Sequence, residues 1–348
     1  MVIVGIDAHK RTHTAVAIDE AGRQLGSKTT EATTTQAHLE LLRWADGFGP
    51  ERRFAVEDCR HLSRRLESDL LGAGEQIVRV PPKMMAHARD AARTYGKSDP
   101  IDALAVARAA LREPGLPVAR LDGPSRDLRL LVDHRDDLVK DRTAHINRLR
   151  WHLHELDPAW DPAPRTLIRF TQLRVLAERL EHLDGIVARI ARDLVVRIRE
   201  LTVHVNALQR EIEARTKVLA PSLLELPGVA GLTAAKILAE TADVRRFSSK
   251  DAFARHNGTA PLPVWSSNKV RHRLSRTGNR QLNAAIHRIA VTQMRMHPDA
   301  RRYLERRMTG GNTKTEALRA LKRRLSDVVY RTLLADANST AACVGEAA

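Results

Sequence analysis

The stretch Val2-Ile3-Val4-Gly5-Ile6-Asp7 decides the fold of the first third of this chain. Its first five residues form a continuous apolar run of strand length, which is typical of a central strand covered on both faces. Asp7 ends this run, so a carboxylate stands at the end of a buried strand. The stretch therefore predicts an α/β domain with an acidic side chain at one edge of its sheet.

Alternating strand and helix patterns follow this first strand. Thr12–Ile18 and Gln24–Thr30 predict two more strands, joined by a turn at Asp19-Glu20-Ala21-Gly22. The pattern then predicts a helix, a strand, a helix and a strand over Thr35–Ala45, Phe54–Glu57, His61–Leu71 and Gln76–Val80. A three-stranded meander followed by that succession is the order of an RNase H-like sheet. Other α/β sheets share much of that order, so the order by itself is weak evidence. We expect an α/β domain over residues 1–120, with an RNase H-like sheet as the arrangement to test.

The composition points to a nucleic-acid partner. Lys and Arg (58) outnumber Asp and Glu (42) in the 348 residues, and the formal net charge of +16 should attract polyanions. No membrane partner is expected, because no apolar run reaches the roughly 18–20 residues that span a bilayer, and Met1–Lys10 is too short for a signal peptide. Cys59 and Cys343 are too far apart to suggest a zinc site. We expect a cytoplasmic, nucleoid-associated protein of two or three domains.

Four acidic residues stand where divalent cations could be held. Asp7 and Glu57 each end a predicted strand, and Asp99-Pro100-Ile101-Asp102 opens a helical segment that continues to Leu111. The i, i+3 spacing puts Asp99 and Asp102 on one side of the first helical turn. Phosphodiester chemistry with two metal ions needs several converging carboxylates, and hard oxygen ligands suit Mg²⁺ or Mn²⁺.

A structural interpretation competes with this metal site. Asp99 before a proline is a usual helix N-cap, and Asp102 then takes the third position of a capping box. The two acids at strand ends could equally be ordinary charges at the edge of a loop. The order of the four acids along strand, strand and helix start favours the metal site. His9 and His13 are expected to be solvated or to face phosphate, and not to bind metal.

Residues 121–220 are expected to form a helical linker. Apolar residues recur at alternating spacings of three and four from Leu173 to Ile212, which is a heptad seam with a stutter. The proline-rich run from Asp157 to Pro164 breaks the linker into two helical segments, and Gly185 is a weak point in the second. An intramolecular helical hairpin and a dimerising coiled coil both fit this pattern.

Residues 221–335 predict a basic, mostly α-helical DNA-binding domain. The run Leu226-Pro227-Gly228-Val229-Ala230-Gly231-Leu232 is similar to the turn of a helix-hairpin-helix element, whose backbone N–H groups hold a phosphate. Gly228 and Gly231 are its candidate nucleic-acid contacts, and a plain interhelical turn is the alternative. Residues 336–348 are small and polar, and we expect a disordered tail there.

A loop broken by Pro261 and Pro263 carries two serines, Ser266 and Ser267. Cationic side chains around a hydroxyl can clamp a phosphate and stabilise the charge that develops during its transfer, although serines are also ordinary loop residues. The candidate nucleic-acid contacts that follow the serines are Lys269, Arg271, Arg273, Arg276, Asn279 and Arg280. A helix is expected from Arg280 to Met294.

Taken together, these motifs resemble the DEDD transposases of the insertion-sequence one-ten type. The motifs that fall in the order of that family are Gly5-Ile6-Asp7, Glu57, Lys97-Ser98-Asp99-Pro100-Ile101-Asp102-Ala103, Leu226-Pro227-Gly228-Val229, the loop from Pro261 to Ser267, and Ser275-Arg276-Thr277-Gly278-Asn279-Arg280. The resemblance covers nearly the whole chain. It implies a RuvC-like domain, a coiled-coil linker and a transposase domain that carries a serine nucleophile.

The resemblance also implies roles for individual residues. The metal-binding tetrad would be Asp7, Glu57, Asp99 and Asp102, and Asp58 could share the role of Glu57. Ser266 would attack a DNA phosphate and form a phosphoserine link, with Ser267 as the alternative nucleophile. The implied partners are donor and target DNA and a guiding bridge RNA. The implied assembly is a homodimer or homotetramer, in which the metal domain of one subunit meets the serine domain of another.

The expected function is therefore DNA strand cleavage and exchange by a transposase that uses metal ions and a serine. Two alternatives stay open. The chain could be a metal-dependent junction nuclease whose serines only hold phosphate, or a non-enzymatic architectural protein that only binds nucleic acid.

Overall fold

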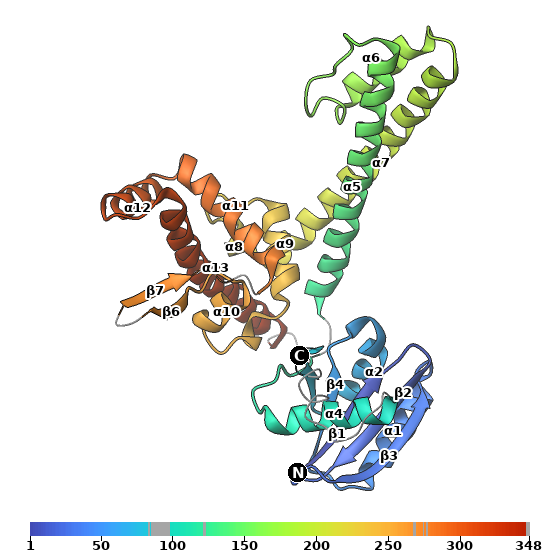
Figure 1. The fold of residues 1–348 in the computed structure, drawn as a ribbon, viewed down its shortest axis with the longest axis vertical. Helices are drawn as coiled ribbons and strands as arrows, with labels where there is room; N and C mark the ends of the chain where they lie inside the picture. Colours follow the sequence, from blue (N-terminus) through green and yellow to red (C-terminus); the bar gives the residue numbers. More distant parts are fainter. Residues whose placement is uncertain are drawn as a thin grey trace. The chain divides into compact units, whose positions relative to one another are not determined.

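The structure is a computed structural model (Figure 1). It describes residues 1–82, 84, 98–120, 123–266, 269–273, 275 and 278–345, and at residues 60, 264–266, 269–272 and 340–345 it describes the backbone alone. The chain divides into two compact units, which we call the first unit (Met1–Asp122) and the second unit (Gly123–Ala348).

A five-stranded sheet forms the centre of the first unit, in the spatial order β3-β2-β1-β4-β5. Strands β1, β2 and β3 are antiparallel neighbours, whereas β4 runs parallel to β1, and β5 parallel to β4. The strands are Val2–Ala8 (β1), Thr12–Ile18 (β2), Gln24–Glu31 (β3), Arg52–Glu57 (β4) and Ile77–Val80 (β5). This topology confirms the RNase H-like sheet that the sequence predicts.

Helices cover both faces of this sheet. Helices α1 (Thr35–Asp46) and α2 (Arg60–Gly72) pack on one face, and α4 (Asp99–Arg112) packs on the other (Figure 1). Neighbouring residues of β1 therefore enter different cores: Ile3 packs with the side chains of α4, and Val4 packs with those of α1 and α2. The strand is buried on both faces, as its continuous apolar run predicts.

The backbone of α4 comes into direct contact with β1 at Gly5. A Cβ atom on Gly5 would lie 2.3 Å from the carbonyl oxygen of Ala103 and 2.4 Å from the backbone nitrogen of Ala107. The side of α4 that faces the sheet is mostly alanine, and both of these alanines are fully buried. Small residues on the strand and on the helix together permit this close approach.

A long helical hairpin opens the second unit. Helices α5 (Pro124–Leu156) and α7 (Ile186–Leu219) pack against each other, and α6 (Phe170–Glu181) packs at their far end (Figure 1). The intramolecular hairpin, one of the two arrangements that the sequence allows, is thus present. Despite the length of these helices, none in the described part of the chain is apolar enough to cross a membrane.

The predicted heptad seam is interrupted within this hairpin. Gly185 adopts a φ of +100°, which ends the helical path between α6 and α7. The seam predicts that Val187, Ile190 and Leu194 face the partner helix. Leu194 does pack against the hairpin core, but Ile190 is exposed, and α7 buries Ala188, Ala191 and Val195 there. Further along, Ile198, Leu201 and Val205 are buried as predicted. A helix that restarts after a left-handed glycine need not keep the phase of the previous one.

The remaining helices of the second unit pack around one apolar core. They are α8 (Pro221–Leu224), α9 (Gly231–Thr241), η1 (Val244–Arg246), α10 (Lys250–His256), α11 (Arg280–Met296), α12 (Pro298–Thr309) and α13 (Lys314–Gly345). Between α10 and α11, the strands β6 (Leu262–Ser266) and β7 (Lys269–Arg273) pair antiparallel. The proline-broken loop predicted here is therefore wrong. Pro263 is tolerated because each strand of a two-stranded sheet is an edge strand.

The predicted disordered tail over residues 336–348 is also wrong as far as the structure describes it, because α13 continues to Gly345. Alanines such as Ala335, Ala337 and Ala341 have high helix propensity and extend the preceding helix. Asp336 is only 4% exposed and accepts hydrogen bonds from the backbone N–H groups of Ser222 (3.2 Å) and Leu223 (3.3 Å). Part of the predicted tail thus anchors the start of α8.

The contact at Gly5 makes the first testable prediction. In Gly5→Ala the new methyl group would meet the backbone of α4, which cannot move aside as a flexible side chain can. We expect the free energy of unfolding to fall by about 1–3 kcal/mol, measured by urea denaturation. Gly72→Ala is the matched control, because its new methyl group would meet no other atom within 4 Å. Equal stability of Gly5→Ala and the wild type would show that α4 does not rest on this glycine.

Candidate functional site

Three elements of the first unit bring acidic residues to the carboxyl end of β1. Asp7 stands one residue before the end of β1, and Glu57 is the last residue of β4. Because Ile6 pairs with Val56 in parallel register, the two acids leave the sheet at the same edge. Asp99 and Asp102 both lie in the first turn of α4, the helix that packs on β1.

The charges of these acids act on one another. Asp7 is 5% exposed, and its pKa is raised to about 6. Burial is the largest cause; the nearby His9 lowers the pKa, whereas the negative charges of Asp102, Asp99 and Glu57 also raise it. All three other predicted acids therefore lie close enough to Asp7 to disfavour its ionisation. The four carboxylates form one electrostatic site.

A histidine joins this acidic site. Nδ1 of His9 lies 3.5 Å from Oδ2 of Asp7 and 4.0 Å from Oδ2 of Asp99. One possible ligand atom from each of these three residues lies within 4.8 Å of the others. The sequence interpretation discounted His9 as a ligand, although its position two residues after Asp7 places it at the same strand end. Among the described residues, none donates a hydrogen bond to the buried Oδ2 atom of Asp7.

Helix capping does not account for the acids of α4. Ser98, and not Asp99, is the N-cap residue, and its side chain makes no capping hydrogen bond. Asp99 is the first residue of the helix, with its side chain about half exposed at 53%. The capping interpretation of Asp99 is therefore wrong by one residue, and its carboxylate faces the site of Asp7 and His9 instead.

The sequence predicted a solvated or phosphate-facing His13. This prediction is wrong, because His13 is fully buried in β2. Its ring lies 5.4 Å from that of His38 in α1, and no described residue makes a hydrogen bond to either of its ring nitrogens. The pKa of His13 is lowered to about 4, mainly by burial and also by the charges of His38 and His9. The strand alternation of β2 places this side chain inside the first unit, so His13 is a neutral core residue.

The residues after Glu57 border the site. The backbone N–H of Asp58 donates to the carbonyl oxygen of Val80 at 2.9 Å, which holds the end of β4 against β5. Burial, together with the charges of Glu57 and Asp7, raises the pKa of the Cys59 thiol to about 11. The thiol is therefore protonated at neutral pH, and a protonated thiol is a poor nucleophile and metal ligand.

The predicted serine site lies in the β6–β7 hairpin of the second unit. Ser266 is the last residue of β6, and its backbone pairs with that of Lys269. The side chains of Ser266, Lys269 and Arg271 lie outside the described part of the structure, as do Lys97, Ser267 and Arg276 entirely. Arg273 and Arg280 are exposed on either side of the segment that joins the hairpin to α11.

The two glycines of the predicted helix-hairpin-helix turn are both closely packed. Gly228 has a φ of +83°, and its Cβ position lies 3.2 Å from Cβ of Thr292. Gly231 begins α9, and a Cβ there would lie 2.5 Å from Cγ of Glu213 in α7. The helix before this turn, α8, has only four residues. Phosphate binding at this turn stays a prediction.

Asn279, another predicted nucleic-acid contact, already uses both polar atoms of its side chain within the chain. Oδ1 accepts a hydrogen bond from the backbone N–H of Leu282 at 2.9 Å and so caps α11, and Nδ2 donates to Oε2 of Glu240 at 2.6 Å. Its neighbour Glu240 is a buried acid that the sequence interpretation missed, because nothing in its helical context marks it.

Comparison with known proteins adds the family to this geometry. Residues 4–158 match a family model of DEDD transposases of the IS110 type, and residues 220–305 match a model described as "Transposase IS116/IS110/IS902 family". The chain is 28% identical to "Insertion element IS116 uncharacterized 44.8 kDa protein" of Streptomyces clavuligerus, over 95% of this chain and 94% of that one. It is 26% identical to "Transposase for insertion sequence element IS1111A" of Coxiella burnetii, over 82% and 75% of the two chains.

Two solved structures of RuvC from Thermus thermophilus are also similar to part of the chain. The first, "T. thermophilus RuvC in complex with Holliday junction substrate", has 19% identity and a TM-score of 0.25, and covers 32% of this chain and 94% of its own. The second has 18% identity and a TM-score of 0.28, and covers 34% and 100%. Because the two family models together match more than half of its residues, the chain belongs to the IS116/IS110/IS902 family of transposases.

Proposed function

We propose that this chain is a DNA recombinase of an insertion sequence, with a divalent-metal site in its first unit and a serine nucleophile in its second. One observation carries the proposal: Asp7, Glu57, Asp99 and Asp102 share one electrostatic site in a chain that belongs to a transposase family. The RNase H-like topology supplies the scaffold, since it ends two parallel strands beside the first turn of a helix.

The donor set fits a hard divalent cation. Carboxylate oxygens are the preferred ligands of Mg²⁺ and Mn²⁺, and the buried oxygen of Asp7 lies among like charges that a cation would neutralise. When bound, such ions would polarise a phosphodiester and would stabilise the negative charge on the attacking and leaving oxygens. The chain's own part is to hold the acids at the end of β1. Asp99 and Asp102 lie in the first turn of α4, at the positive end of the helix dipole.

We assign the nucleophile to Ser266, with Ser267 as the alternative. The serine oxygen would attack a DNA phosphorus, its proton would pass to a base, and the bond from phosphorus to the leaving DNA oxygen would break. The product is a phosphoserine ester and a DNA strand with a free hydroxyl group. The exposed guanidinium groups of Arg273 and Arg280 provide positive charge near the ends of β7 and α11 for the phosphate.

Guide RNA and self-assembly are further parts of the proposal. The net charge of +16 supports polyanion binding, and RNA that copurifies with the protein would test the guide.

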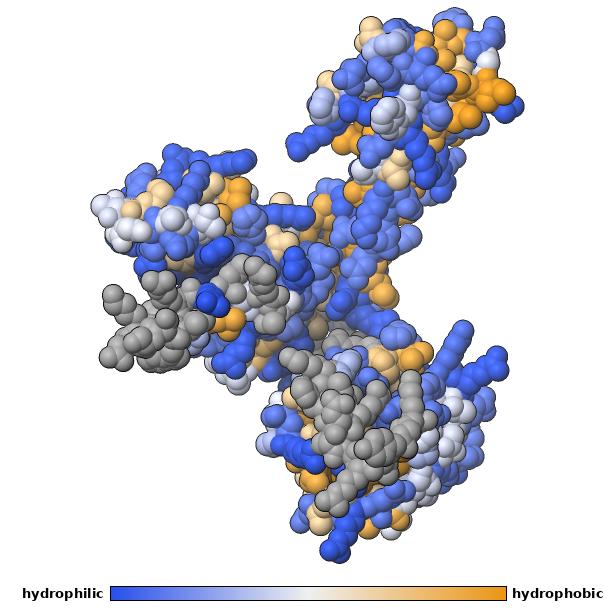
Figure 2. All heavy atoms as spheres, in the orientation of Figure 1, coloured by the Kyte–Doolittle hydropathy of each residue, from blue (hydrophilic) through white to orange (hydrophobic). Residues whose placement is uncertain are grey.

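Apolar side chains stand exposed towards the α6 end of the helical hairpin (Figure 2), among them Phe170 (44%), Val175 (55%), Ile186 (68%) and Val196 (56%). A second copy of the chain would cover them, and a monomer in sedimentation experiments would contradict this.

Without metal, the ionised Asp7 should destabilise the first unit. Folding raises its pKa from 3.8 to about 6, so the unfavourable contribution is absent below the unfolded pKa and complete above the folded one. In EDTA, we expect Asp7→Asn to raise the free energy of unfolding by on the order of 1–3 kcal/mol at about pH 7.5, and by little at about pH 3.5. Urea denaturation measures both values.

In Mg²⁺ the wild type should become more stable than Asp7→Asn. A ligand that binds the folded state stabilises that state, and Asp7→Asn lacks one of the metal-binding carboxylates. Glu40→Gln, an exposed substitution in α1, is the control and should follow the wild type throughout. A wild-type protein that gains no stability from Mg²⁺ or Mn²⁺ would argue against the metal site.

Loss of a tetrad carboxylate should abolish strand cleavage. Glu57→Gln and Asp102→Asn keep the shape of each side chain but remove a metal ligand that contributes several kcal/mol to charge stabilisation. We expect cleavage of DNA to slow by about 100-fold or more, while salt-sensitive DNA binding stays as in the wild type. Glu40→Gln is again the control. Unchanged transposition in these variants would leave the architectural protein as the better account.

Substitution of the serines separates a recombinase from a junction nuclease. Ser266→Ala should abolish the covalent protein–DNA adduct on denaturing gels and also strand exchange, because it removes the hydroxyl that we assign to the phosphoserine ester. Ser339→Ala, an exposed substitution in α13, is the control. If the adduct is lost in Ser267→Ala but persists in Ser266→Ala, the nucleophile is Ser267 and not Ser266. An adduct that persists without both serines would contradict covalent catalysis.

A further inference from the structure

The segment that carries Ser266 leaves and rejoins the second unit at one place, which we call the hairpin base. It consists of residues 256–258, where α10 ends, and residues 278–279, which precede α11. The backbone N–H of Asn279 donates to the carbonyl oxygen of His256 at 2.7 Å. A Cβ on Gly278, whose φ is +103°, would lie 2.7 Å from the same oxygen and 2.9 Å from the nitrogen of Gly258. The β6–β7 hairpin therefore projects from a closed base.

Hydrogen bonds with α11 and α13 hold the part of the hairpin base that follows α10. Asn257 is fully buried, and its Nδ2 donates to Oγ of Ser326 in α13 at 2.7 Å. The carbonyl oxygen of Asn257 accepts from Nδ2 of Asn283 in α11 at 2.7 Å, and Oδ1 of Asn283 accepts from Nζ of Lys322 at 2.6 Å. The leading end of the hairpin is thus fixed by hydrogen bonds to two helices.

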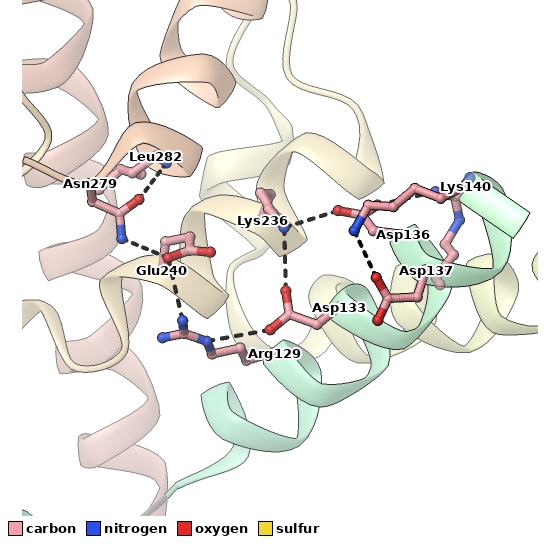
Figure 3. Close-up of polar contacts among 10 residues, drawn as sticks. Arg129, Asp133, Asp136, Asp137, Lys140, Lys236, Glu240, Asn279 and Leu282 are labelled. Carbon is pink, nitrogen blue, oxygen red and sulfur yellow. Dashed lines mark hydrogen bonds and ion pairs between the residues drawn. The ribbon is translucent and has the colours of Figure 1, made fainter. Parts of the chain in front are cut away.

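The trailing end is fixed by a carboxylate from a third helix. Glu240 in α9 is 5% exposed, and its Oε2 atom accepts the 2.6 Å hydrogen bond from Asn279. The same atom lies 3.9 Å from Nη2 of Arg129 in the second turn of α5, the helix that opens the second unit. Figure 3 shows this chain of contacts, with Arg129 also 3.6 Å from Asp133 and Lys236 reaching both Asp133 and Asp136.

We propose that Glu240 is a positioning residue for the serine hairpin, which it ties through Asn279 and Arg129 to the long helix α5. The inference rests on the proposed function for the role of Ser266. Through its hydrogen bond with Asn279, Glu240 fixes the turn from which the hairpin strands project. It thereby determines the direction in which the hairpin leaves the rest of the second unit, relative to α5.

Stability alone does not account for Glu240. The cap of α11 needs only Oδ1 of Asn279 and would form without a carboxylate beside Nδ2. Burying a carboxylate costs desolvation, and an apolar residue would often stabilise such a site more. What the carboxylate adds is direction, because a short charge-assisted hydrogen bond restricts the orientation of its donor.

A reciprocal exchange of donor and acceptor tests the proposal. Asn279→Asp keeps the cap of α11 but sets two carboxylates against each other. Glu240→Gln with Asn279→Asp restores one hydrogen bond, now donated by Gln and accepted by Asp. Hydrogen exchange of the β6 and β7 amides, read by mass spectrometry on the full chain, should accelerate by about 10- to 100-fold in Asn279→Asp and return to near the wild-type rate in the double variant.

The matched control is Asp137→Asn in α5, which removes an exposed ion pair with Lys140 but leaves Glu240, Asn279 and Arg129 untouched. Its hairpin exchange and adduct formation should match the wild type. Adduct formation, measured at saturating DNA, should fall about 10-fold or more in Asn279→Asp and recover in the double variant. If Asn279→Asp does not fold, the double variant is compared with Glu240→Ala instead. Hairpin exchange should stay near the wild-type rate in the double variant and accelerate in Glu240→Ala.

Hairpin exchange that does not change in Asn279→Asp, or that the second substitution does not restore, would overturn the proposal. The failure of the proposed function has a different signature. In that case the adduct persists without either serine, while hairpin exchange still responds to Glu240 and Asn279.

Discussion

The close approach of α4 to β1 at Gly5 is the constraint on which the acidic site depends. Asp7 and Asp99 are separated by a long stretch of chain, and only the packing of one helix on one strand brings them together. At Gly5 the helix backbone occupies the space that any side chain would fill. A strand and a helix in such contact hold their ends in fixed relation, so the first turn of α4 stands beside the end of β1. The parallel pairing of β1 with β4 adds Glu57 by the same geometric reasoning.

This arrangement concentrates negative charge at a buried place. Each carboxylate raises the energy of the others, as the high pKa of Asp7 indicates, and folding must supply the energy that keeps them together. The apolar cores on the two faces of the sheet provide that energy. An unneutralised group of acids in a well-packed domain is typical of a site that a cation completes. In a chain of a transposase family, the chemistry of DNA phosphates is the natural use of such a site.

The second unit positions its candidate nucleophile by a different device. No close helix–strand contact fixes the β6–β7 hairpin in the part of the chain that the structure describes. Its base is held instead by directional hydrogen bonds from Asn257, Asn279 and Asn283, with Glu240 as the buried acceptor. Polar groups are suited to this task, because hydrogen bonds specify orientation whereas apolar contacts mainly specify proximity. Since Arg129 of α5 reaches the same carboxylate, the linker helix and the hairpin share one anchoring point.

The sequence by itself determined the elements whose pattern is local. The apolar run of β1, the alternation in β2, the acids at the ends of β1 and β4 and the acidic first turn of α4 could all be read from spacing. The order of those elements was enough to predict the sheet. Strand and helix periodicities are properties of neighbouring residues, so they survive without knowledge of the rest of the chain.

Tertiary structure decided which of those residues meet and which face inwards. It placed His9 with the acids and His13 in the core, shifted the buried face of α7 after Gly185, paired β6 with β7 despite Pro263, and continued α13 through the expected tail. It also gave Glu240 its role, although no motif marks that residue. Each outcome depends on contacts between segments far apart in the chain, and the energy of such contacts is set by packing and burial, which local spacing does not encode.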